Sequence, residues 1–193
     1  MYKKQMTLQR ITCYLLLIVA ALIFVYSLGI ITDLYDTLRV FSEDPEHPLI
    51  EGAEVYMEMQ EFNKLFTLFG VLLILSALAN MVFGAASRRR YYLSNYITIV
   101  LNAVGNVAVS VWAIINIYSY RAQYLEVDFA SLEVLAPLYG IEAYQSTFWF
   151  DVCPVVFVPV ILVSLLSIAN LVWKHLLMKG ERALLEGSVE VEK

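Results

Sequence analysis

The sequence predicts an all-α integral membrane protein, a bundle of four transmembrane helices with both termini in the cytoplasm. Hydrophobic residues make up 60% of the 193 residues and charged residues only 16%, whereas charged residues account for about a quarter of a typical soluble domain. The apolar residues are gathered into long runs, and the basic residues lie mainly on one side of those runs. Together these observations place the chain in a lipid bilayer.

Four runs of 22, 22, 25 and 22 residues contain no Asp, Glu, Lys, Arg or His, and each is long enough to span the hydrocarbon core as a helix. They are Ile11–Thr32, Leu65–Ala86, Leu93–Ile117 and Val152–Trp173. The first run is longer than the apolar core of a signal peptide, so we expect a retained anchor. The segments between the runs are too short for a separate soluble domain, so residues 1–193 form a single membrane domain.

The basic residues predict the orientation, because Lys and Arg beside a span resist crossing the membrane. Ten of them lie in the N-terminal segment, the inner loop 87–92 and the tail 174–193, and three lie in the outer loops 33–64 and 118–151. The outer loops carry 14 acidic residues, no glycosylation sequon and no pair of cysteines. We therefore expect a multi-pass protein of a bacterial plasma membrane with an acidic outer face.

Small polar residues recur at helical spacing within three of the spans. They are Ser76, Asn80 and Gly84; Asn102, Asn106 and Ser110; and Ser164, Ser167 and Asn170. Because an unpaired amide in hydrocarbon is costly, these faces are expected to turn toward each other or toward a partner, with Asn80, Asn102 and Asn170 at one depth. These side chains are expected either to form hydrogen bonds between helices or to line a site for a polar ligand or solute.

The second and fourth spans share a short pattern that suggests an internal repeat. Ala79–Phe83 and Ala169–Trp173 both follow A-N-[ML]-V-[FW], and they stand 90 residues apart. Two duplicated helical hairpins would explain the pattern, as in some transporters. The alternative is that apolar helices resemble one another through composition alone.

The first outer loop is expected to be irregular over residues 42–48 and helical after Gly52. Its apolar residues Val55, Met59, Phe62 and Phe66 then share one side of the helix. An acidic stripe, Glu51, Glu54, Glu58 and Glu61, follows the other side. The stripe is either a solvated face or a surface for a basic partner. Glu43, Asp44 and Glu46 lack the twelve-residue calcium-loop pattern, so we expect no metal.

The second outer loop is too apolar for a disordered linker. Its side chains must bury against the first loop, the outer leaflet or another protein, and we expect a partner contact there. The candidate contact residues are Leu132, Val134, Leu135, Leu138 and Tyr139. An aromatic collar, Tyr144, Phe148, Trp149 and Phe150, is expected where the fourth span enters the membrane. Past that span, the tail is expected to form a short interfacial helix.

The spans contain no ionisable side chain, and such groups mark proton transfer or catalysis within a membrane. We therefore expect no enzyme and no cofactor. Arg88, Arg89 and Arg90 are expected to set the topology or to attract anionic lipid. The favoured hypothesis is an accessory or structural subunit that binds other integral membrane subunits of a larger assembly, such as a transport complex, and no nucleic acid. The alternative is a small transporter or channel protomer with an amide-lined solute path.

Overall fold

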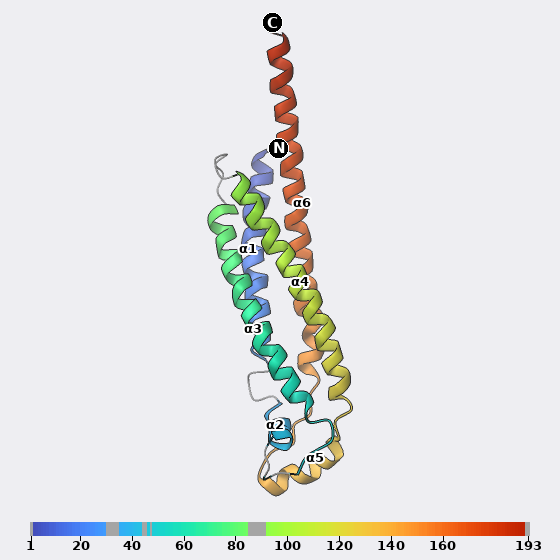
Figure 1. The fold of residues 1–193 in the computed structure, drawn as a ribbon. Helices are drawn as coiled ribbons and strands as arrows, with labels where there is room; N and C mark the ends of the chain where they lie inside the picture. Colours follow the sequence, from blue (N-terminus) through green and yellow to red (C-terminus); the bar gives the residue numbers. More distant parts are fainter. Residues whose placement is uncertain (1, 30–34, 44–45, 47, 85–91, 192–193) are drawn as a thin grey trace. The chain divides into compact units, whose positions relative to one another are not determined.

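The computed structural model describes residues 2–29, 35–43, 46, 48–84 and 92–191 (Figure 1). The described part of the chain is helical and contains no β-strand. Four of its helices are long and apolar enough to cross a membrane, which confirms the predicted all-α membrane class. They are α1 (Tyr2–Ser27), α3 (Val55–Ala79), α4 (Tyr92–Tyr124) and α6 (Phe148–Val191).

The helices are longer than the apolar runs from which the spans were predicted. Helix α1 begins well before Ile11 and ends at Ser27, and Thr32, the expected end of the first span, lies outside the described residues. The chain turns at Gly29, where an added Cβ would lie 2.7 Å from a ring atom of Trp149. The tail is not a separate helix, because α6 continues without a break to Val191.

Shorter helices account for parts of both predicted outer loops. The prediction missed α2 (Asp36–Glu43), so Ser42 and Glu43, expected in the irregular part of the first loop, are helical. Helix α3 begins at Val55, as expected from the absence of breakers after Gly52. In the second loop, α5 (Phe129–Leu135) leads into the 3-10 helix η4 (Ala136–Tyr139). A π-helical turn, η2 (Asn80–Gly84), follows α3.

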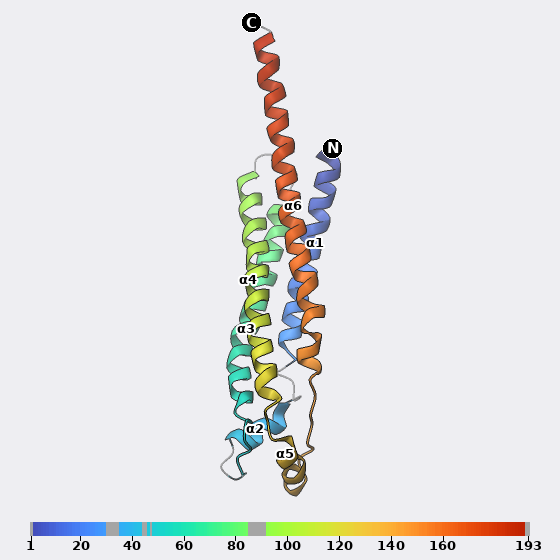
Figure 2. The same cartoon turned by 90° about the vertical axis from the view of Figure 1, so that its right-hand side faces the viewer.

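The chain divides into two compact units, and each long helix contributes residues to both. Unit 1 comprises Met1–Ala20, Leu73–Val107 and Pro159–Lys193. Unit 2 comprises Ala21–Leu72 and Ala108–Val158. Within unit 1, the last turns of α6 continue past the N-terminal end of α1 (Figure 2).

The interior of unit 2 is aromatic. The ring of Tyr26 stacks on Trp149 with 5.0 Å between centroids, and Phe66 and Phe157 meet it edge to face. The Tyr26 hydroxyl donates to the Trp149 carbonyl at 2.7 Å, and Trp149 Nε1 donates to the Tyr26 carbonyl at 3.3 Å. Aromatic pairs of this geometry add to the packing of a core.

The predicted aromatic collar is therefore only half correct. Trp149 and Phe150 are buried within unit 2, while Tyr144 and Phe148 are exposed. Successive residues of a helix point about 100° apart, so a run of adjacent aromatic residues cannot all face the membrane boundary.

The two loops of unit 2 fold onto each other and form what we call the cap, residues 35–43, 48–54 and 125–147. Gly52 adopts a φ of +83°, and a Cβ there would lie 3.0 Å from the backbone of Val127. The Asp128 amide donates to the Glu51 carbonyl at 3.1 Å. Figures 1 and 2 show α2 and α5 grouped where α3 begins and α4 ends. Part of the apolar second loop is thus buried against the first loop, one of the three expected alternatives.

Hydrogen bonds from the first loop also hold the last part of the cap. The hydroxyl of Thr37 donates to the Glu142 carbonyl at 3.0 Å, and that of Tyr35 donates to the Ser146 carbonyl at 3.3 Å. Burial, together with the neighbouring Tyr124 hydroxyl, raises the pKa of Tyr35 above its ordinary value. The cap is therefore an ordered element built from both loops.

Candidate functional site

The polar residues predicted to line the spans are turned into the protein. Asn80, Asn102, Asn106 and Asn170 are all at most 3% exposed. Ser110, Ser164 and Ser167 are also buried, and Ser76 is half-buried. Residues three or four apart share a helix face, which explains why each set turns inward together. Ser110 belongs to unit 2, and the others belong to unit 1.

One hydrogen-bonded group in unit 1 joins α3 to α4. Asn102 Nδ2 donates to Ser76 Oγ at 3.0 Å and reaches the Leu73 carbonyl at 3.4 Å. Asn106 Nδ2 donates to Asn102 Oδ1 at 3.1 Å. These bonds match the role of polar side chains that hold membrane helices together.

A second group joins α1 to α6, and the sequence analysis missed most of it. Gln5 Nε2 lies 3.4 Å from Asn170 Oδ1 and 3.2 Å from Gln9 Oε1. Lys174 Nζ donates to the same Gln9 oxygen at 3.3 Å and lies 5.8 Å from the centre of the Tyr96 ring. Gln5, Gln9 and Lys174 are all buried. The protein interior therefore holds a basic side chain that the apolar-run analysis placed in the tail.

A spacing signal in the sequence was available for this second group. Gln5 and Gln9 are four residues apart, as are Asn170 and Lys174, so each pair lies on one helix face. They were overlooked because the spans were defined by the absence of charge. A helix continues beyond its apolar run wherever other helices cover its polar side chains.

Several buried polar atoms have no hydrogen-bond partner within the described part of the chain. In unit 1 these are both side-chain atoms of Asn80, Oδ1 of Asn106 and Oε1 of Gln5. Asn80 also opens the π-helical turn η2, and such turns are frequent at functional sites. Leaving a buried polar atom unpaired costs about 1–3 kcal/mol. These atoms are therefore the part of unit 1 with unused capacity to bind a polar molecule.

Asn80, Asn102 and Asn170, which were expected at one depth, do not hydrogen-bond to one another among the described residues. Asn102 bonds to α3, Asn170 bonds to α1, and Asn80 bonds to neither. The two copies of the A-N-[ML]-V-[FW] pattern also differ locally, because Asn80 begins a π-helical turn and Asn170 lies within α6. The shared pattern does not extend to shared contacts.

The acidic stripe lies where its spacing predicts. Glu51, Glu54, Glu58 and Glu61 are exposed, and the opposite side of the segment is buried through Val55, Met59, Phe62 and Phe66. No group of three His, Cys, Asp or Glu is positioned to hold a metal among the residues that the structure describes. Arg88, Arg89 and Arg90, with Asp44 and the side chain of Glu43, lie outside the described residues.

The five candidate contact residues of the second loop do not share one face, so that prediction needs correction. Leu132 is 1% exposed and belongs to the core of the cap, and Leu135 is half-buried. Val134 and Leu138 are 67% and 74% exposed, and Tyr139 is 45% exposed. We call these three exposed side chains the α5 surface. Helix α5 packs against the rest of the cap and buries one of its sides. Leu132 lies on that buried side, so it cannot belong to a contact surface.

The α5 surface rests on a defined support. The Asp128 side chain caps α5 by accepting from the Ser131 amide at 3.1 Å, and bonds from Ser131 lower the pKa of Asp128. Gly140 ends η4 in the left-handed conformation at a φ of 71°. The ring of Tyr139 packs against the buried ring of Phe41, with 6.1 Å between centroids. The surface is thus held in place before any partner binds.

Comparison of the chain with protein families, with curated proteins and with solved structures found no match.

Proposed function

We propose that the protein is a non-enzymatic accessory subunit that binds a larger membrane assembly, such as a transport complex, through the α5 surface. The observation that carries this proposal is the exposure of Val134 and Leu138, four residues apart in an ordered part of the cap, beside the exposed Tyr139. Exposed apolar side chains outside the membrane are typical of protein contact surfaces. The internal hydrogen bonds of the cap reduce the entropy that is lost on binding.

The buried amides change the predicted mode of assembly. Because Asn80, Asn102 and Asn106 face the protein interior, they are not available to partner helices. The exposed acidic residue Glu133 lies next to Val134 on α5. The partner is therefore an integral membrane protein whose extramembrane part offers an apolar patch with a basic rim.

Purification from the native membrane in mild detergent tests the proposal. A stoichiometric second protein should accompany the wild-type chain and be lost at least tenfold from a variant carrying both Val134→Ser and Leu138→Ser, because two large apolar contacts are removed. Leu49→Ser is the matched control, since Leu49 is an equally exposed cap residue outside the α5 surface. Unchanged recovery of the partner with the double variant would refute this mode of binding.

The proposed orientation places both termini in the cytoplasm and the cap outside a bacterial plasma membrane. Its support is the charge distribution, with ten basic residues in unit 1 and three in unit 2. Both native cysteines are buried, so single introduced cysteines can be labelled selectively. Leu138→Cys should react with an impermeant reagent on intact cells, and Arg89→Cys only after permeabilisation. The reverse labelling pattern would mean that the topology is opposite to the one proposed.

A second candidate function is a solute path through unit 1. It is favoured by the unpaired buried atoms of Asn80, Asn106 and Gln5, which can exchange hydrogen bonds with a polar solute. Purified protein in liposomes would then conduct a small polar solute, and Asn80→Leu would reduce the flux. Absence of flux from protein that remains folded in the liposomes would exclude this candidate.

A further inference from the structure

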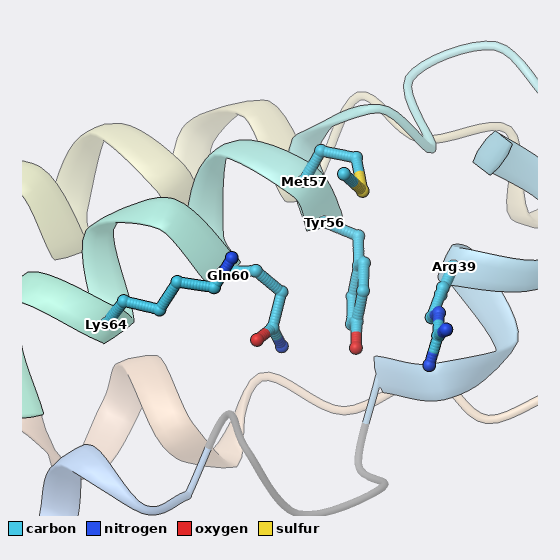
Figure 3. A pocket seen from close by; sticks show the side chains of 5 residues that line it. All are labelled: Arg39, Tyr56, Met57, Gln60 and Lys64. Atoms are coloured by element: carbon cyan, nitrogen blue, oxygen red, sulfur yellow. The ribbon is translucent and has the colours of Figure 1, made fainter.

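The cavity beside α3 holds little unused capacity for hydrogen bonds. Arg39 of α2 lies across it from Tyr56, and Gln60 and Lys64 come from the same helix as Tyr56 (Figure 3). Arg39, Tyr56 and Gln60 already interact with other groups. Capacity for a further hydrogen bond is found instead on buried amides without a partner among the described residues, and Asn80 is the clearest of these in unit 1.

Asn80 differs from the other amides of unit 1, because neither its side-chain nitrogen nor its oxygen has a partner within the described part of the chain. Gln5 and Asn106 each leave only an oxygen unpaired, since their nitrogens donate to Gln9 and Asn102. Asn80 is also 0% exposed. Buried amides are nearly always hydrogen-bonded, because burial without a partner is unfavourable. Asn80 therefore needs a partner that the described residues do not supply.

The side chain of Asn80 is turned toward the interior, and it lies at an interrupted part of its helix. Ala77, one turn earlier, is also fully buried, whereas Val82 and Phe83 are exposed. Asn80 opens the π-helical turn η2, where the regular ladder of backbone hydrogen bonds is interrupted. Interruptions of this kind accommodate inserted water molecules. Asn63 of unit 2 also has two unpaired atoms, but it lies within the regular helix α3, so among the described residues Asn80 alone combines the two features.

The contacts between the helices of unit 1 place a second unpaired acceptor at about the depth of Asn80. Asn102 of α4 bonds to α3 one turn before Asn80. Because α3 and α4 are antiparallel, Asn80 lies opposite the part of α4 between Asn102 and Tyr96. The Tyr96 hydroxyl donates at 3.3 Å to the α6 carbonyl next to Asn170, and Asn170 Oδ1 accepts from Gln5 Nε2 at 3.4 Å. The unpaired Oε1 of Gln5 is therefore close to the level of Asn80.

We propose that Asn80 binds ordered water in the interior of unit 1, where water accepts from Asn80 Nδ2 and donates to Asn80 Oδ1. Water suits this site because Asn80 offers both a donor and an acceptor, whereas an ion would satisfy only one of them. The complete burial of Asn80 favours the smallest molecule of this kind. Gln5 Oε1 is an acceptor for a further water hydrogen, in keeping with the roughly three hydrogen bonds that a buried water makes.

An experimental structure of the full-length protein in lipid, at a resolution that shows ordered water, tests the proposal. Solvent density is expected within hydrogen-bond distance of both side-chain polar atoms of Asn80, and it should be lost in Asn80→Leu. Asn102 is the internal control, since its nitrogen and its oxygen are both bonded within unit 1, and it should have no solvent beside it. An Asn80 side chain that bonds directly to the protein, or that has no solvent beside it, would overturn the proposal.

Nuclear magnetic resonance of protein with isotope-labelled asparagine gives a second measurement. Magnetisation should pass from water to the side-chain amide of Asn80, and Asn80→Leu should remove that signal. Asn116→Leu is the matched control, since Asn116 bonds to a carbonyl of its own helix in unit 2, and it should leave the signal unchanged. A larger molecule bound at Asn80 in place of water would overturn the proposal and favour the solute path. Ordered water at Asn80 in folded protein that conducts no solute would support the water site and exclude the path, so the two are tested separately.

Discussion

The interiors of the two units are built from different chemistry. Unit 2 packs aromatic rings around Tyr26 and Trp149, whose polar atoms bond to each other's backbone. Unit 1 packs amides and a buried lysine, and neither side-chain polar atom of Asn80 has a partner among the residues that the structure describes. Both units hold buried polar atoms with no partner among the described residues, on Asn63 and Ser110 in unit 2 and on Asn80, Asn106 and Gln5 in unit 1. The contrast therefore lies between the aromatic packing of unit 2 and the hydrogen-bonded amides of unit 1. The proposed contact surface lies on unit 2, and the hydrogen-bonded amides lie in unit 1.

The largest effect is expected from removing the centre of the aromatic core. Trp149→Ala should lower the free energy of unfolding by roughly 3–5 kcal/mol, because a buried ring and its stacking on Tyr26 are lost. Phe148→Ala is the control, since the adjacent Phe148 is 68% exposed and should change stability by at most about 0.5 kcal/mol. Denaturant titration in mixed micelles measures both. If both variants lowered the free energy of unfolding equally, Trp149 would not belong to a core that excludes the exposed Phe148.

A smaller effect is expected where the two loops of the cap meet. Gly52→Ala should cost about 1–3 kcal/mol, because Gly52 combines a φ of +83° with a 3.0 Å approach to the Val127 backbone. Gly180→Ala is the matched control, since nothing lies within 4 Å of a Cβ there, and the substitution should be neutral or slightly stabilising. Thermal unfolding of the two variants checks the difference. A neutral Gly52→Ala would mean that the cap is not tightly closed.

Within unit 1, the paired and unpaired amides should respond differently. Asn102→Leu should cost about 1 kcal/mol, because it removes bonds to Ser76 and Asn106 at roughly 0.6 kcal/mol each. Asn80→Leu should be neutral or stabilising, since Asn80 makes no hydrogen bond within the described part of the chain. Unfolding titrations of both variants test the contrast. A strongly destabilising Asn80→Leu would show that Asn80 has a partner after all.

The smallest effect is expected at the start of α5. The pKa of Asp128 is lowered by its bonds to Ser131, so its capping contribution is complete above the ordinary aspartate pKa and is lost as the pH falls through the lowered value. The protection of the Ser131 amide from hydrogen exchange, relative to its intrinsic exchange rate at each pH, should therefore fall at acidic pH. Asp128→Asn keeps a capping side chain without the titration, so it should abolish this pH dependence. A variant that retained the pH dependence would implicate another group.

The fold class could be predicted because a bilayer imposes a strict length and polarity on each span. The same reasoning located the buried side of the segment around Val55, Met59 and Phe62, since helical spacing specifies a face without any knowledge of its neighbours. The ends of the helices were harder to predict from the sequence. Ser27 ends α1 because of a turn beside Trp149, a residue that is distant in sequence.

The candidate sites were predicted as sets of residues but not as networks. The inward placement of Asn102 and Asn170 follows from the cost of burying an amide in lipid. Their partners do not follow, because a hydrogen bond to Ser76 or to Gln5 depends on how the helices pack. Lys174 could not be predicted as part of this group for the same reason. A charged side chain beyond an apolar run is normally solvated. Only the packing of the helices shows that Lys174 contacts Gln9 and Tyr96.

Photo-crosslinking in the native membrane tests whether the α5 surface contacts a partner protein. A photoreactive residue in place of Leu138 should give one dominant crosslinked protein, and the same residue in place of the exposed Glu54 on the acidic stripe should not. The account predicts that the crosslink at position 138 disappears when Val134→Ser is added. No crosslink at position 138, or equal crosslinks at both positions, would contradict the assignment of the α5 surface as the contact with a membrane partner.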